Sequence, residues 1–484
     1  MKLSKLVITQ FSILFALLIG TRLSHAQSSN SSKPNIVIIT TDQQFADAMS
    51  FRMGKKWIHT PNMDKLASEA MFFTRAYAAN PLCVPSRNSI ITGQFPHTIG
   101  IQANDDLASW GGNKNQKYWT NQDYKSLGIY FRDAGYETAY FGKWHLNYDP
   151  KDNASNGFEI VEELSKSYTD DKIPNAVNGF LEQTHQKPLL LWASFYNPHD
   201  ICQWSRFEEL PQGPIDKLPP IDQLPPLPAN LLPSKNETEA MALIRESYHQ
   251  NLKLFPVGDY SHFDWQRLAW GYYRLIEKVD AQIGQLMKVL KDNGYDKNTL
   301  FVFTSDHGDC LGAHGFNQKT VFYEESARVP LILKYSGKIN AGLNKTLVNT
   351  GTDLLPTLLD FAGIAVPKDL PGISLKDAAE ENATFRSPTF IVVENKMTQG
   401  GPVDGKVPVV NGRMVRGERY KYCLYDILNH REALFDLEND PGETINIAEQ
   451  ESSKDIILKY RGYLEKFASA NHDELAINML NCLK

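Results

Sequence analysis

The sequence predicts an α/β fold: a large mixed, mostly parallel sheet sandwiched by helices, followed by a small C-terminal antiparallel sheet with one helix. Two observations lead to this prediction. Up to about residue 370, apolar runs rich in β-branched residues alternate with helical patterns, and several runs end directly in polar residues. Beyond residue 371 the strands become short, with only turn residues between them.

The first 26 residues differ in character from the rest of the chain. Two lysines precede an apolar run over residues 11–20, and Ser24-His25-Ala26 offers small residues for cleavage. This pattern is typical of a secretory signal peptide, and the run is too short to span a membrane. We therefore expect a secreted or periplasmic protein without a membrane span, in three parts: a signal peptide (1–26), an α/β domain that carries the chemistry (27–370) and a C-terminal α+β subdomain (371–484).

The composition is that of a globular protein, with 42% hydrophobic and 22% charged residues among 484. The formal net charge of −6 argues against general binding to nucleic acid, so an anionic substrate needs a local cationic pocket. The cysteine spacing fits neither a zinc site nor a dense disulfide framework, and a disulfide among the last four stays open. The cysteines are Cys83, Cys202, Cys310, Cys423 and Cys482.

The first predicted strand, Asn35 to Thr41, is a nearly continuous β-branched run, as expected for a strand buried on both faces. It ends in Asp42-Gln43, at the end of the strand where open α/β sheets place their sites. Thr60-Pro61 then has the form of an N-cap followed by proline in the first turn. It predicts a helix that extends to about Ala70.

The later elements follow the same alternation. Strands are predicted at 137–141, 189–195 and 299–305, the last two buried, and they lead into Lys143 and His145, His199, and Asp306-His307. Helices are predicted over 124–134, 265–293 (capped by Asp264) and 353–361, with another strand at 329–334. The proline-rich segment 211–233 is expected to be extended. The C-terminal strands are predicted at 389–394, 409–416, 420–425 and 433–437, and the last helix at 453–468.

The segment from Asn80 to Gly93 is the feature around which we interpret the chain. Pro85 fits the first turn of a helix and Gly93 its C-terminal end, so Cys83 lies at or just before a helix N-terminus. Unpaired N–H groups and a partial positive charge gather there, which suits an anion. Arg87, one turn later, adds a fork of donors for an oxyanion.

Cys83-Val84-Pro85-Ser86-Arg87 matches the Cys-x-Pro-x-Arg signature of the type I sulfatase family, and the likeness continues into Thr92-Gly93. Other strings that resemble the family are 142–145, 197–199, 314–326 and 433–443, so the resemblance covers about residues 33–446. It implies an alkaline-phosphatase-like fold and an exported hydrolase that cleaves sulfate esters. The expected substrate is a sulfated oligosaccharide or polysaccharide.

The resemblance also implies a metal site at the ends of two buried strands, made by Asp42, Gln43, Asp306, His307 and the modified Cys83. Many members have a second aspartate where this chain has Gln43, which makes this site less anionic. His307 replaces an asparagine seen in some members. Oxygen-rich ligation favours Ca²⁺, with Mg²⁺ and Mn²⁺ left open.

In this family the cysteine is oxidised to formylglycine, whose hydrated aldehyde is the nucleophile, so a maturation enzyme is an implied partner. The resemblance places five further side chains around it: Arg87, Lys143, His145, His199 and Lys319. A metal and such donors can neutralise a sulfate monoester, while Asp306 takes the proton of the attacking hydroxyl. We expect His199 or Lys319 to protonate the leaving alcohol. The second hydroxyl of the hydrate expels sulfate, which a serine or cysteine cannot do.

Two other functions stay open at this point. A formylglycine-dependent phosphonate or phosphodiester hydrolase uses the same nucleophile and metal chemistry, and turnover of an aryl phosphonate in preference to an aryl sulfate would indicate it. A chain with an unmodified Cys83 would instead be a non-catalytic protein that binds sulfated glycans. Ulvan, carrageenan, heparan and chondroitin fragments all remain possible substrates.

Overall fold

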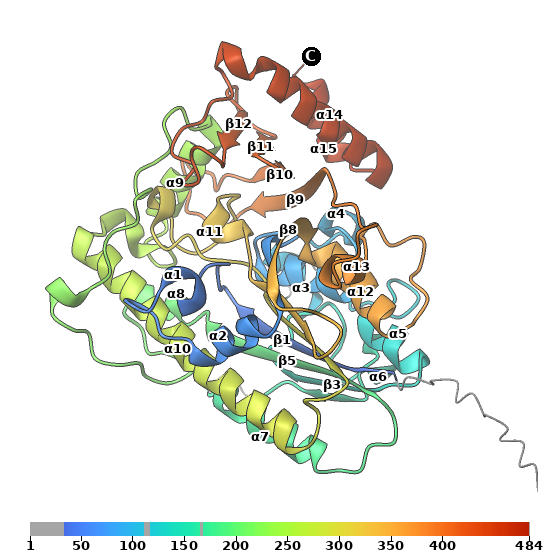
Figure 1. Ribbon diagram of the computed structural model, residues 1–484. Helices are drawn as coiled ribbons and strands as arrows, with labels where there is room; N and C mark the ends of the chain where they lie inside the picture. Colours follow the sequence, from blue (N-terminus) through green and yellow to red (C-terminus); the bar gives the residue numbers. More distant parts are fainter. Residues whose placement is uncertain (1–32, 111–116, 165–167, 484) are drawn as a thin grey trace, which may run out of the picture. The chain divides into compact units, whose positions relative to one another are not determined.

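The computed structural model describes residues 33–110, 117–164 and 168–483, so the predicted signal peptide lies outside the described residues. Its main sheet has eight strands: β1 (Asn35–Asp42), β2 (Met71–Tyr77), β3 (Glu137–Gly142), β4 (Ile160–Glu162), β5 (Leu189–Pro198), β6 (Thr299–Ser305), β7 (Leu331–Tyr335) and β8 (Gly342–Asn349). Their order is β4-β3-β5-β1-β6-β7-β2-β8; Figure 1 labels β3, β5, β1 and β8 among them. Only β7 runs antiparallel to its neighbours. The mixed, mostly parallel sheet is therefore confirmed.

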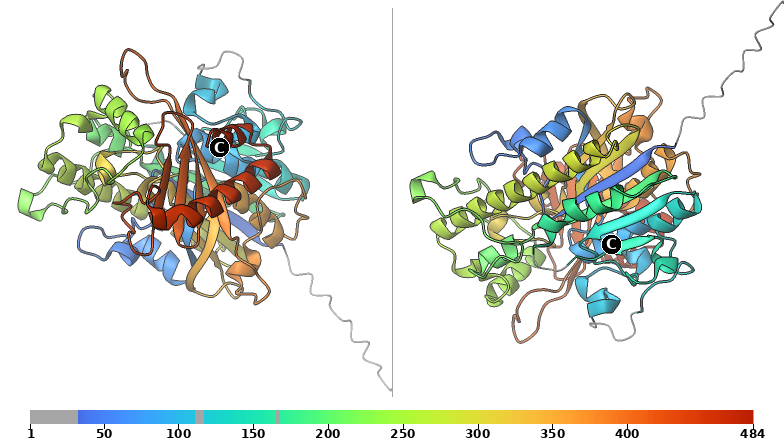
Figure 2. Two further views of the ribbon diagram at one scale, coloured as in Figure 1. Left: turned by 90° about the horizontal axis from the view of Figure 1, so that it is seen from above. Right: turned by 90° about the horizontal axis from the view of Figure 1, so that it is seen from below.

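Helices cover both faces of this sheet (Figure 2). Successive side chains of the central strand β1 enter two different cores, Val37 and Ile39 on one face and Ile36 and Ile38 on the other. This is why the strand reads as a continuous apolar run. The first core is completed by α2 (Pro61–Ser68), α7 (Thr169–Leu181) and α10 (His262–Asp292), and the second by α3 (Cys83–Thr92), α5 (Leu127–Asp133) and α12 (Thr350–Phe361).

The C-terminal part contains the predicted small antiparallel sheet. Its strands are β9 (Phe390–Met397), β10 (Val410–Gly417), β11 (Tyr420–Tyr425) and β12 (Glu432–Asp436), in the order β12-β11-β10-β9. One face packs against α14 (Lys454–Asn471) and α15 (Glu474–Asn481) through a core that includes Val415 and Leu464. Opposite residues such as Val393 belong to the first core of the main sheet. The described residues from Lys33 onward form one compact unit, and the boundary at residue 370 stays a prediction.

Several elements differ from the sequence prediction. The patterns do not predict β2, because it follows α2 without glycine or proline to separate the two. They also miss β8, whose first residues are exposed, as well as α7, α9 (Glu239–Gln250) and α15. The predicted cap of α10 is wrong: the helix begins at His262, after Ser261. Asp264 is the third helical residue and accepts from the Ser261 N–H at 2.9 Å, which completes a capping box.

The remaining helices are short: α1 (Ser50–Met53), α4 (Pro96–Ile99), α6 (Asn153–Asn156), α8 (Ile201–Ser205), α11 (Glu324–Ala327) and α13 (Lys376–Ala379). None of the helices in the described part of the chain is both long and apolar enough to cross a membrane. The five cysteines are free thiols, so none of them pairs in a disulfide.

The order of the strands determines where polar residues meet. The four adjacent strands β3, β5, β1 and β6 are parallel, so their C-terminal ends lie at one edge of the sheet. Lys143, His199 and Asp306 directly follow three of these strands, and Asp42 ends the fourth. This edge is where parallel α/β sheets carry their functional sites.

Candidate active site

Cys83 is the first residue of α3, as the sequence predicts. Leu82 precedes the helix in an extended conformation, and Gly93 ends it with φ of 68°. Glycine readily adopts this left-handed conformation, so the chain turns away at that point. All ten residues of α3 are buried. The thiol therefore lies inside the protein, at the edge of the sheet where the parallel strands end.

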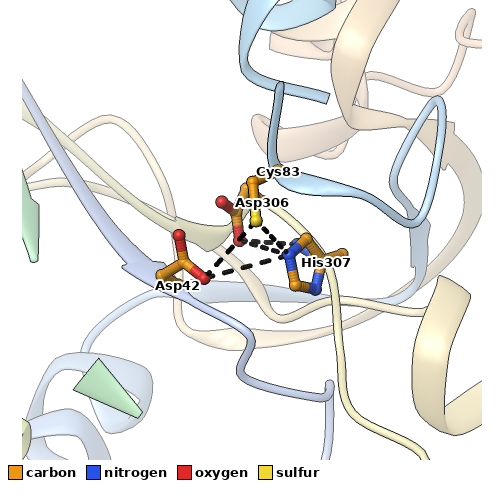
Figure 3. A group of neighbouring side chains, drawn as sticks. All are labelled: Asp42, Cys83, Asp306 and His307. Carbon is orange, nitrogen blue, oxygen red and sulfur yellow. Dashed lines mark hydrogen bonds and ion pairs between the residues drawn. The ribbon is translucent and has the colours of Figure 1, made fainter. Parts of the chain in front are cut away.

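Four side chains with atoms that can bind a metal converge beside this helix: Asp42, Cys83, Asp306 and His307 (Figure 3). His307 Nε2 lies 3.2 Å from Cys83 Sγ, 3.6 Å from Asp306 Oδ1 and 3.8 Å from Asp42 Oδ1. One ligand atom from each residue lies within 4.8 Å of all the others, and no side chain is more than 2% exposed. They come from β1, α3 and the segment after β6, so folding brings them together.

Two cations hold the carboxylates of this group. Arg87 donates from Nε to Asp306 Oδ2 at 2.7 Å and from a terminal nitrogen to Asp42 Oδ2 at 3.2 Å. Lys143 donates to the same oxygen of Asp42. Burial raises the pKa of Asp42, but the charges of Lys143, Arg87 and Lys319 together outweigh it and hold this pKa well below its ordinary value. Burial and the Asp42 charge raise the pKa of Asp306.

Gln43 lies beside the group but has different partners. Its backbone N–H donates to Asp306 Oδ1 at 3.1 Å. Its amide oxygen accepts from Lys319 Nζ at 2.8 Å, and its amide nitrogen donates to Asp309 Oδ2 at 2.6 Å. The side chain thus connects Lys319 to Asp309, and its oxygen faces a cation.

Cationic and histidine side chains surround the sulfur of Cys83. Lys319 Nζ lies 3.1 Å from Sγ, and His145 and His199 lie close enough for Cys83 to act on the pKa of each imidazole. Burial and Asp42 raise the pKa of the thiol, but Lys143, Lys319 and His307 outweigh them and hold it well below its ordinary value. A thiolate is therefore favoured at this position.

The two histidines near the sulfur are held neutral. Burial, together with the charge of Lys143, lowers the pKa of His145 to about 3 and that of His199 to about 4. Lys319 is the opposite case: burial lowers its pKa, but Cys83, Cys202 and Asp42 together outweigh burial and raise it above the ordinary value. The site thus offers one firmly protonated ammonium group and two neutral imidazoles next to the same atom.

The folded chain brings together every site residue that the sequence predicts, and it adds others. Asp309 lies three residues after Asp306 in the sequence, and this closeness to a predicted site residue could have identified it. Asn197 and Asn317 are buried, and neither amide has a hydrogen-bond partner among the described residues. Each lies two residues before a predicted site residue, His199 or Lys319, but the pattern of the sequence gives no indication of their unpaired state.

Comparison with known proteins agrees with the family that the sequence motifs indicate. The sulfatase family model matches residues 34–364, and the model of the N-sulphoglucosamine sulphohydrolase C-terminal region matches residues 312–470. A Delta 4,5-hexuronate-2-O-sulfatase of Bacteroides thetaiotaomicron is 28% identical over 94% of this chain and 93% of its own length. An N-acetylglucosamine-6-O-sulfatase of the same organism is 30% identical over 74% and 73% of the two chains.

The fold is also shared with a solved structure, that of a 2-O GAG sulfatase. It superposes with a TM-score of 0.77 at 26% identity and covers 92% of this chain and 93% of that one. The family match extends over well more than half of the sequence. This chain therefore belongs to the type I sulfatase family and is a sulfuric ester hydrolase with an alkaline-phosphatase-like fold.

Proposed function

We propose that this sulfatase acts after export on sulfated oligosaccharides, through a formylglycine nucleophile formed from Cys83. The observation that carries the proposal is the position of Cys83 Sγ. It lies at a helix start, 3.1 Å from the Lys319 ammonium group and 3.2 Å from His307, next to two buried carboxylates. A nucleophile there faces a place that can hold both a cation and an anionic ester.

The donor set beside Cys83 fits a divalent cation. Asp42 and Asp306 bring two buried carboxylates within reach of His307 Nε2, and a metal would remove their mutual repulsion. We propose that these residues hold the ion, joined by the amide oxygen of Gln43 and by position 83. Such an oxygen-rich set favours Ca²⁺ over soft metals, with Mg²⁺ and Mn²⁺ as alternatives. The metal would polarise a sulfate oxygen and increase the acidity of a bound hydroxyl.

Formylglycine at position 83 would supply a hydroxyl nucleophile and, in its hydrated form, a second hydroxyl through which sulfate leaves. The residues of this chain provide the rest. Lys143 and Arg87 balance the charges of Asp42 and Asp306, so the site as a whole does not repel an anion. Lys319 is protonated and close to position 83, which suits it to hold the sulfate oxygens.

Proton transfer is assigned by charge and burial. The raised pKa of Asp306 supports a role as acceptor of the nucleophile's proton. His199 is neutral before substrate binds, and a bound sulfate ester would raise its pKa because an anion favours the imidazolium form. We propose that His199 then protonates the leaving alcohol, with Lys319 as the other donor and His145 as a contact to the ester.

The substrate class is proposed from the relatives. The two Bacteroides enzymes are named for sulfate at position 2 of a hexuronate and position 6 of N-acetylglucosamine. Both substrates are sugars, although the sulfated positions differ. The two relatives therefore share a sulfated sugar as substrate, and we propose a sulfated oligosaccharide for this chain. Export through the segment 1–26 and modification by a formylglycine-generating enzyme complete the proposal, and a mature N-terminus near Gln27 would support the export step.

The test begins with the mass of the tryptic peptide of residues 76–87, from protein made in a host that installs formylglycine. Conversion of the thiol to an aldehyde lowers its mass by ~18 Da. The same preparation is then assayed on sulfated disaccharides, an aryl sulfate and an aryl phosphonate, with Cys83→Ala as the control. The proposal expects the mass shift, release of sulfate from a saccharide and loss of turnover in the variant. A preference for the phosphonate, or saccharide turnover by Cys83→Ala, contradicts it.

A further inference from the structure

A large cavity lies far along the sheet from the active site. Its volume is about 720 Å³, and it is lined by β8, by the turn between β10 and β11, and by α14. In the main sheet β8 is the edge strand, three strands away from β6 and four from β1. No residue of the cavity belongs to the group around Cys83. A volume of this size is typical of sites for small ligands, which take roughly 300–1,000 Å³.

The charge of this cavity is mainly positive. Arg75, Lys345 and Lys459 line it, and among the described residues none of the three has an ion-pair partner. Arg75 is half-buried, on β2, and its backbone lies opposite Leu347 of β8. A fourth cation, Arg419, is paired with Asp436 at 2.6 Å. Glu418 is the one acidic residue in the lining.

Three tyrosines form the other part of the wall: Tyr420, Tyr460 and Tyr463. Tyr463 stacks on Phe390 with ring centroids 4.6 Å apart, and Tyr460 is only 4% exposed. These rings are therefore fixed by packing before any ligand arrives. Thr346, Ser387 and Thr389 add hydroxyl groups to the lining. Lys459 Nζ lies over the Tyr463 ring, 5.6 Å from its centroid. Aromatic rings, hydroxyls and cations that lack an ion-pair partner are what a sugar ring that carries oxyanions would contact.

We propose that this cavity binds a stretch of a sulfated glycan chain, away from the place where sulfate is removed. The sulfate groups would contact Arg75, Lys345 and Lys459, and the sugar rings would lie against Tyr420 and Tyr463, which are partly exposed. A nucleic acid fits less well, because the protein as a whole carries a net charge of −6. The choice of a sulfated glycan rests on the proposed function, whereas the cavity and its charges do not depend on it.

The experiment measures retention on immobilised chondroitin sulfate and on the same polymer after chemical desulfation. A triple variant, Arg75→Gln with Lys345→Gln and Lys459→Gln, is compared with a control that loses three exposed lysines elsewhere, Lys151→Gln with Lys187→Gln and Lys297→Gln. We expect about tenfold weaker binding for the cavity variant, because three contacts between opposite charges are lost. The control should bind like the parent, and the desulfated polymer should be retained weakly by all.

Aryl sulfate turnover is measured on the same proteins, and it should be unchanged because none of the three cavity residues touches the site. If Arg75→Gln does not fold, the double variant of the two exposed lysines, Lys345→Gln with Lys459→Gln, should still lose several-fold in affinity. The proposal is overturned if the cavity and control variants lose the same affinity for chondroitin sulfate. It is also overturned if the parent protein binds the desulfated polymer as tightly as the sulfated one. If the protein shows no sulfatase turnover but the cavity variant still loses retention and the control does not, the glycan-binding proposal is supported and the proposed function fails.

Discussion

Arg87 Nε lies 2.7 Å from Asp306 Oδ2, and both side chains are about 1% exposed. The same guanidinium reaches Asp42 at 3.2 Å and Ser194 Oγ at 2.7 Å. An arginine that the sequence offers as an oxyanion donor thus binds the two carboxylates of the site. Its fixed fork suits this task, because one side chain can hold groups from two different strands.

Replacement of Arg87 by methionine should destabilise the protein strongly. It leaves two buried carboxylates with less compensation, and removal of one partner of a buried pair typically costs about 3–5 kcal/mol. Arg87→Lys keeps the charge but loses the fork, so we expect an intermediate loss of unfolding free energy. Urea denaturation measures both. Lys125→Met is the matched control, since it removes an exposed pair with Asp133, and a loss in Lys125→Met as large as in Arg87→Met would contradict this account.

Lys319 should control the ionisation of the unmodified thiol. Burial and Asp42 raise the pKa of Cys83, and Lys319 is one of the groups that lower it. In protein made without the maturation enzyme, Lys319→Met should therefore raise this pKa. The absorbance of the thiolate is titrated against pH, with Cys83→Ala subtracted to remove the other cysteines. An unchanged titration in Lys319→Met would show that the ammonium group at 3.1 Å has no such effect.

Removal of the proposed metal should lower both activity and thermal stability. Asp42 and Asp306 are buried side by side, and the charge of Asp42 already raises the pKa of Asp306. A bound divalent cation would relieve this repulsion, and at a hundredfold excess over Kd it would stabilise the fold by about 2.7 kcal/mol. We expect a chelator to decrease the Tm and Ca²⁺ to restore it. In Asp306→Asn the chelator should no longer shift the Tm, and an equal shift there would place the metal elsewhere.

His97 should make stability depend on pH. Burial lowers its pKa, but the hydrogen bond and charge of Glu394, at 2.6 Å, outweigh burial and raise it above the ordinary 6.5. A raised pKa in the folded state means that the stabilisation is complete below pH 6.5 and is lost as the pH rises through the folded value. The unfolding free energy, measured by urea denaturation from pH 6 upward, should fall more for the parent than for His97→Gln. If the unfolding free energies of the parent and His97→Gln fall in parallel with pH, the ionisation of His97 does not contribute to stability.

The sequence predicts the position of the site well, because the relevant strands are buried on both faces. Each reads as a continuous apolar run, and the residue that ends it stands out, as Asp42 and Asp306 do. Parallel neighbours then place these ends at one edge. The partners within the site are harder to predict. Gln43 pairs with Lys319, which is 276 residues away, and no local pattern contains such a contact.

The missed elements have a similar explanation. The strand β2 follows α2 without a glycine or proline between them, so no residue marks the change from helical to strand periodicity. The first residues of β8 are exposed, and their pattern shows neither a buried run nor a clear alternation. Ser261 caps α10 through a capping box with Asp264, and each of the two is a residue type that commonly caps helices. Tertiary packing decides these cases.

The burial of Cys83 has a consequence for how the mature protein arises in the cell. The side chain is 2% exposed, and the helix that carries it is buried throughout. The enzyme proposed to oxidise Cys83 would need the backbone around this residue in its own active site, and the folded protein does not expose that backbone. The proposed oxidation would therefore have to precede folding, while the segment is still an unfolded nascent chain. A chain that folds first would be trapped as a stable thiol form, and the ratio of the two forms would record which process was faster.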